Sequence, residues 1–122
     1  MSLPSPGAPA DEQFFARLST LNDRFAAEVP ALIAGLAAVR GAFDASAPDL
    51  ALAGEMHTLL HTMAGSAATF GFRVLGQRSR ALEQRLRVLM AFDAVLAPDW
   101  QAWLGELDEF VAWGRRDPKA AS

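Results

Sequence analysis

Both histidines of the chain lie in the stretch His57-Thr-Leu-Leu-His61-Thr-Met-Ala-Gly65-Ser-Ala-Ala-Thr-Phe-Gly71. If the stretch is helical, each residue turns by about 100° and the large apolar side chains share one narrow face. That face carries Leu52, Met56, Leu59, Leu60 and Met63. His61 points away from it, so we expect a solvent-facing imidazole on a helix whose opposite side packs into a core.

The helical face around His61 carries only small residues, namely Ala64, Gly65 and Ala68. A glycine inside a helix costs about 1 kcal/mol relative to alanine. The presence of Gly65 inside a helix therefore calls for an explanation, and the close approach of another molecule is one. We predict that Ala64, Gly65 and Ala68, together with His57 one turn before His61, form a surface on which a partner docks.

The composition of the chain indicates which class of protein it belongs to. The chain has 122 residues, of which 52% are hydrophobic and 20% charged, so we expect one globular domain. Its net charge of -3 gives no electrostatic reason to bind nucleic acid. No apolar run approaches the roughly 18 residues of a membrane span, and no signal peptide is visible at the start. The lack of cysteine fits a cytoplasmic protein, which we expect it to be.

The two histidines have the spacing of a helical metal site, but the rest of that motif is missing. A zinc-binding His-Glu-x-x-His helix has a glutamate after the first histidine, whereas Thr58 follows His57 here. The sequence offers no obvious third ligand. We therefore expect no metal site, and the sequence contains no phosphate-binding loop or dinucleotide-binding glycine pattern.

Apolar residues recur at three- and four-residue steps from Phe14 to Phe43, which predicts a long amphipathic helical region. Asp11 suits the N-cap of this region. Pro30 interrupts it, so the helix either kinks there or divides into one helix of about 11–28 and another that starts near residue 30. We favour a kinked or briefly broken pair, because the apolar phase continues across the proline.

Three further helices are predicted at about 48–67, at about 71–92 and from Pro98 to Gly114. Connections of a few residues make neighbouring helices antiparallel. We predict an all-α fold over residues 11–116, an up-down antiparallel four-helix bundle on which an additional N-terminal helical segment packs. Residues 1–10, as a disordered tail or linker, and residues 117–122, as a disordered tail, flank it.

A family resemblance rests on His61, Gly65, Ser66 and Gly71, followed by Leu75, Leu82 and Glu83. These residues resemble the pattern of the histidine-containing phosphotransfer (Hpt) domain, which runs roughly His-x-Leu-Lys-Gly-Ser, a glycine and a helix with Leu-Glu. The resemblance covers about residues 20–92 and implies a helical bundle. Ala64 departs from the pattern, because the family usually has lysine three residues after the histidine.

The resemblance implies a role for each site residue. His61 would accept a phosphoryl group from the aspartate of a receiver domain and pass it to another receiver. Glu83 would orient the imidazole from the next helix. Apart from the resemblance, Arg80 and Arg87 lie three and four residues from Glu83 on the same side of that helix, and we expect one of them to supply the positive charge that Ala64 lacks. A degenerate bundle that binds a receiver or kinase without being phosphorylated is the alternative.

The same resemblance implies the partners of the chain, which are response-regulator receiver domains and a hybrid sensor histidine kinase. The chain would be a phosphocarrier rather than an autonomous kinase, because it has no ATP-binding segment. It would need no cofactor of its own, since Mg²⁺ is expected in the acidic site of the receiver. We expect it to act as a monomer.

Overall fold

The computed structural model describes residues 9–92 and 95–117. These residues form four helices, namely α1 (Pro9–Ala42), α2 (Leu50–Thr69), α3 (Arg73–Ala91) and α4 (Ala97–Arg116). Most of both predicted tails lies outside the described residues. Residues 9 and 10, assigned to the first tail from sequence, belong to α1.

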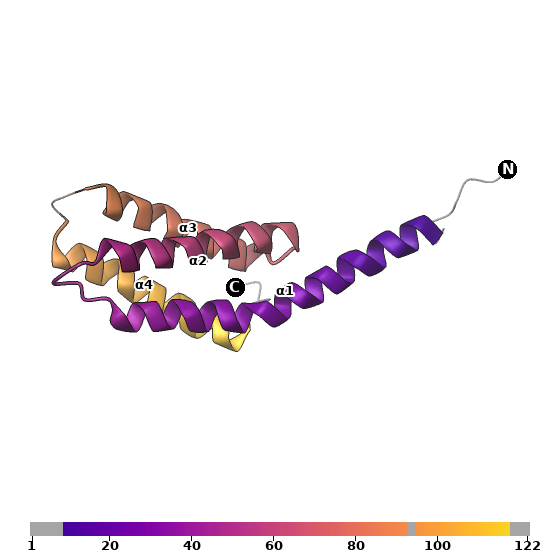
Figure 1. The fold of residues 1–122 in the computed structure, drawn as a ribbon, viewed down its shortest axis with the longest axis horizontal. Coiled ribbons are helices and arrows are strands. Elements are labelled where there is room, and N and C mark those ends of the chain that lie inside the picture. The colour runs from indigo at the N-terminus through magenta and orange to yellow at the C-terminus, as the bar shows by residue number, and fades with distance from the viewer. Residues whose placement is uncertain (1–8, 93–94, 118–122) are drawn as a thin grey trace.

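The helices form a ring of four packed neighbours. α1 packs against α2, α2 against α3, α3 against α4, and α4 back against α1, whereas the backbones of the diagonal pairs do not come close within the described residues. Short connections join consecutive helices, so each runs antiparallel to the one before it (Figure 1). This arrangement confirms the predicted all-α four-helix bundle.

The core is a continuous cluster of apolar side chains from all four helices. Trp100 packs against Phe43 at a ring distance of 4.9 Å near the α1–α2 connection, and Phe25 packs against Phe72 at 5.1 Å near the α2–α3 turn. The indole nitrogen of Trp103 donates a hydrogen bond to the carbonyl oxygen of Leu82 over 3.0 Å. This bond satisfies a buried polar group and ties α4 to the part of α3 that carries Glu83.

Pro30 does not break α1, so of the two alternatives the divided pair is wrong, whereas Figure 1 shows α1 bending where it leaves the bundle, as a kinked helix does. The helix is continuous from Pro9 to Ala42. The proline is exposed, while Val29 and Ile33 are buried beside it and hold the helix in the core. Asp11 lies in the first turn, where its charge complements the helix dipole, and is not the N-cap.

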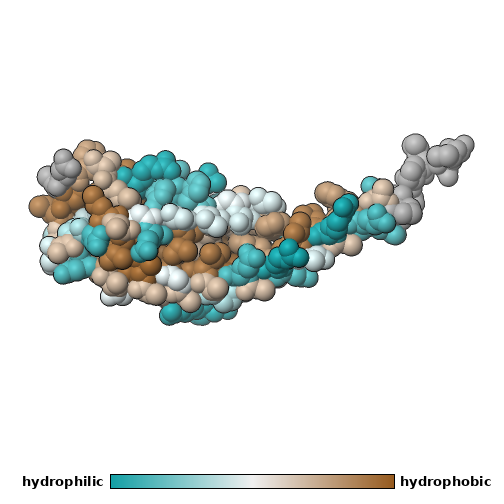
Figure 2. Space-filling view, in the orientation of Figure 1, coloured by the Kyte–Doolittle hydropathy of each residue, from teal (hydrophilic) through white to brown (hydrophobic). Residues whose placement is uncertain are grey.

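The N-terminal part of α1 projects beyond the bundle instead of packing on it (Figure 1). Residues 10–24 are exposed or half-buried, and their apolar side chains form brown patches along the projecting helix in Figure 2. The expected packing of this segment is therefore wrong. The reason is length: Phe25 already contacts Phe70 and Phe72 in the α2–α3 turn, so the neighbouring helices end at its level.

By length and composition alone, α1 is long and apolar enough to cross a membrane. A core helix meets the same criterion. Phe25, Val29, Ile33 and Leu36 of this helix are buried against the other helices, with at most 3% of each residue exposed.

Substitution of the projecting aromatic residues should leave the bundle folded. Phe14 and Phe15 are 55% and 64% exposed, so the double variant Phe14→Glu, Phe15→Glu should change the free energy of unfolding by no more than about 1 kcal/mol. Phe25→Ala is the matched control, because it empties a core site and should cost about 3–5 kcal/mol. Urea denaturation measures both. A loss in the double variant equal to that of Phe25→Ala would mean that the projecting segment packs on the bundle in solution.

The α2–α3 hairpin sets the register of the candidate site. Gly71 adopts a φ of +81°, which closes the turn, and Gly76 then brings α3 close to α2: a Cβ added there would lie 3.4 Å from that of Ala67. The two helices run antiparallel from this turn, so residues at similar distances from it along α2 and α3 lie opposite each other. His61 therefore faces Glu83.

Candidate functional site

His61 stands exposed on α2 and is held from behind. Its side chain is 69% exposed, while Leu60 and Met63 beside it are fully buried. Its Nδ1 lies 3.0 Å from Oε1 of Glu83 on α3. Because an ionised carboxylate can only accept, Nδ1 donates this hydrogen bond, and in the neutral ring the lone pair is then on Nε2. The predicted exposure of His61 and its predicted contact with Glu83 both agree with the structure.

Glu83 is a buried carboxylate next to nitrogen groups of His57, His61 and Arg87. Only 6% of its side chain is exposed, and Nη2 of Arg87 donates a hydrogen bond to Oε1 over 2.7 Å. Burial raises the pKa of this carboxyl group, but the hydrogen bond from His61 and the charges of His61, Arg87 and His57 outweigh burial and lower the pKa below its ordinary value. Glu83 is therefore ionised at neutral pH and accepts hydrogen bonds.

His57 points inward, which the sequence did not indicate. Its Nε2 is buried, lies 3.3 Å from Oε1 of Glu83 and has no partner in hydrogen-bond geometry. Its ring lies parallel to that of His61, with centroids 6.1 Å apart and planes 10° apart. With 27% of the side chain exposed, His57 is less accessible than His61, and its role in docking stays a prediction.

The small residues near His61 divide into two groups. Gly65 and Ala68 are exposed as predicted, and a Cβ added at Gly65 would meet nothing within 4 Å. Ala64 is only 2% exposed, so the expectation that it faces solvent is wrong. The cause is the close approach of α3, because a Cβ added at Gly76 would lie 3.6 Å from the carbonyl oxygen of Ala64.

A groove between α2 and α3 begins one turn beyond His61. It is lined by Ala64, Ala68, Gly71, Arg73, Gly76, Gln77 and Arg80. Arg80 is exposed there and, within the described part of the chain, makes no ion pair, whereas Arg87 is bound to Glu83. Of the two arginines considered from sequence, Arg80 is thus the one whose guanidinium group is not paired with Glu83. Arg73 at the same groove was not singled out, because nothing local distinguishes it from the other arginines of α3.

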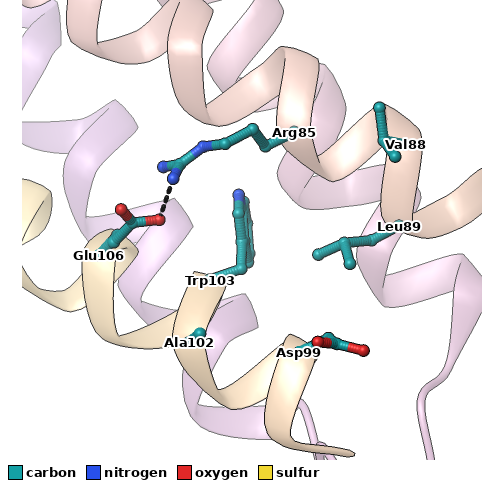
Figure 3. A pocket seen from close by; sticks show the side chains of 7 residues that line it. All are labelled: Arg85, Val88, Leu89, Asp99, Ala102, Trp103 and Glu106. Atoms are coloured by element: carbon teal, nitrogen blue, oxygen red, sulfur yellow. Dashed lines mark ion pairs between the residues drawn. The ribbon is translucent and has the colours of Figure 1, made fainter. Parts of the chain in front are cut away.

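A second hollow lies between α3 and α4 (Figure 3). The ion pair of Arg85 with Glu106 spans it, and Trp103 stands between Arg85 and Leu89 in its wall. It contains no histidine, and its lining residues are separate from those that surround His61. In residues 9–92 and 95–117, no group of three or more histidine, cysteine or acidic side chains is placed to hold a metal ion.

The comparison with known families identifies the chain. A family model described as the Hpt domain matches residues 20–113, which include His61, Glu83 and most of the bundle. No curated protein and no solved structure matches the chain. Hpt domains are helical bundles that carry out histidine phosphotransfer in phosphorelays, where they interact with receiver domains and kinases. Since the match covers well over half of its length, the chain belongs to the Hpt domain family.

Proposed function

We propose that this chain is a phosphocarrier that accepts a phosphoryl group on Nε2 of His61 from a receiver aspartate and passes it to a second receiver. The observation that carries the proposal is the pairing of an exposed imidazole with a buried, ionised carboxylate 3.0 Å from Nδ1. That pairing leaves the outer ring nitrogen unprotonated and able to attack.

The transfer needs positioning more than covalent machinery. The lone pair of Nε2 attacks the phosphorus of the aspartyl phosphate, the bond from phosphorus to the carboxylate oxygen breaks, and the carboxylate departs with the electron pair. The ring keeps its proton on Nδ1 and gains positive charge. Glu83 stabilises that charge from 3.0 Å away, and onward transfer reverses the same steps.

Arg80 is our candidate for stabilising the phosphoryl group. It lines the groove that begins at Ala64, the position where the family usually has lysine. Its long side chain and free charge suit a dianion placed near the end of that groove. We further propose that the chain acts as a cytoplasmic monomer and that Mg²⁺ is held by the receiver.

Labelling tests the proposal directly. The purified chain is incubated with receiver domains that carry a radioactive aspartyl phosphate, and in parallel with phosphoramidate, a small donor. We expect an acid-labile, alkali-stable label on the chain from both donors, as a phosphohistidine gives. Binding of receivers without any label from either donor would instead support the degenerate module, which the alanine at position 64 favours.

Glu83 should act as a positioning residue, which two substitutions separate. Glu83→Gln keeps an acceptor oxygen for Nδ1, so phosphotransfer should persist, whereas Glu83→Ala removes it and should slow transfer roughly 10-fold. Time courses of labelling with phosphoramidate measure both rates, and circular dichroism checks that each variant is folded. Transfer by a folded Glu83→Ala variant at the parental rate would remove this role from Glu83.

A further inference from the structure

Three nitrogen groups converge on a single oxygen atom in the site. Oε1 of Glu83 lies 2.7 Å from Nη2 of Arg87, 3.0 Å from Nδ1 of His61 and 3.3 Å from Nε2 of His57. A carboxylate oxygen has two lone pairs in its plane. Two hydrogen bonds, from Arg87 and His61, use them, and His57 is the third group, close to the charge but outside hydrogen-bond geometry.

His57 is the sheltered member of the set. The side chains of Arg87 and His61 are 64% and 69% exposed, so water competes for both of their hydrogen bonds. Nε2 of His57 is buried, and water does not reach it. A buried polar atom without a partner destabilises the folded state, and this cost is lowest when Nε2 carries a proton, because the partial positive charge of the N–H group then lies near the negative oxygen.

The tautomer of His57 follows from the same contact. If Nε2 carried a lone pair, that lone pair would face the carboxylate oxygen at 3.3 Å and repel it. With the proton on Nε2, the two groups attract each other, and the carboxylate is drawn toward α2. Oε1 is then held where Nδ1 of His61 meets it.

We propose that His57 is a positioning residue, which fixes the carboxylate of Glu83 through its Nε2 proton and thereby selects the Nδ1–H tautomer of His61. This inference rests on the proposed function for its purpose, because that tautomer leaves Nε2 of His61 free to attack. The two parallel imidazoles thus carry their protons on opposite nitrogens, and both of these nitrogens lie within 3.3 Å of the same oxygen.

Nitrogen NMR of the imidazoles tests the inference without any phosphorylation. Spectra are recorded at pH 8, above the reference pKa of about 6.5 for a free imidazole. In the parent protein, we expect His57 protonated at Nε2 and His61 at Nδ1. A parent spectrum with His57 protonated at Nδ1 would overturn the inference, whatever the variants do.

Two substitutions of His57 supply the second test. His57→Phe keeps an aromatic ring but removes the donor, so His61 should shift toward a mixture of tautomers and labelling by phosphoramidate should slow roughly 3-fold, less than for loss of Glu83 itself. His57→Gln places an amide donor near the same point and should restore both readouts. Gln84→Leu, an exposed change beside Glu83 on the far side of the site, is the matched control and should alter neither.

The outcomes separate this inference from the proposed function. An unchanged His61 tautomer in His57→Phe would show that His57 only fills space, even if the melting temperature falls. If the parent chain takes no label from any donor, the proposed function fails, whereas the tautomer spectra still decide whether His57 positions Glu83.

Discussion

His61→Gln should abolish phosphorylation of the chain by receivers and by phosphoramidate alike. Glutamine fills much of the space of the imidazole but has no nitrogen lone pair that can attack phosphorus. The side chain is 69% exposed, so the change should leave helical content unchanged and alter the free energy of unfolding by about 1 kcal/mol or less. Radiolabelling and far-ultraviolet circular dichroism measure the two effects on the same sample.

The matched control for this loss is His57→Gln, the same substitution one turn earlier on α2. That variant should still be labelled, because its amide can replace the donor that faces Glu83. Labelling that persists in His61→Gln and disappears in His57→Gln would reverse the assignment of the phosphoacceptor. The comparison is sharp because the two rings lie parallel, 6.1 Å apart, beside the same carboxylate.

The parts of the fold that could be read from sequence are those fixed by local patterns. Apolar periodicity located all four helices, and Pro98 lies in the first turn of α4 as expected. Pro48 was expected to open α2, but Asp49 is the N-cap, because its carboxylate accepts a hydrogen bond from the backbone nitrogen of Ala51 over 2.8 Å. Pro48 and Asp49 both favour the start of a helix, and the side-chain cap formed by Asp49 sets the first residue of α2.

The projecting segment of α1 shows where periodicity fails. Phe14, Leu18 and Leu21 follow the same apolar phase as the buried Phe25, so the sequence predicts one continuous buried face. Whether that face is covered depends on how far the neighbouring helices extend. The α2–α3 turn lies level with Phe25 of α1, so no neighbouring helix covers the residues before it. The apolar pattern of one helix carries no information about the length of another.

The candidate site also has some features that local patterns predict and others that depend on tertiary packing. The pairing of His61 with Glu83 was predictable, because a short turn and antiparallel packing fix which residues of α2 and α3 meet. The burial of Ala64 was not, since it depends on how closely α3 approaches at Gly76. The inward contact of His57 was missed for a related reason: a helical wheel gives the direction of a side chain but not the charge that lies across from it.

Gly65→Gln should block phosphotransfer from a receiver and leave labelling by phosphoramidate intact. Gly65 lies one turn beyond His61 on the same exposed side, where a receiver must come close for in-line transfer. Because a Cβ there would meet nothing within 4 Å, a glutamine side chain should project into the docking space. It should hold the partner's aspartate away from Nε2 of His61, whereas a small donor still reaches that atom.

The fold should tolerate this change, which separates docking from packing. Gly65 is inside α2 and has no positive φ, so replacing it should stabilise the helix by up to about 1 kcal/mol. Normal transfer from a receiver to Gly65→Gln, or a sharp fall in its own melting temperature, would show that the missing side chain at position 65 does not serve docking.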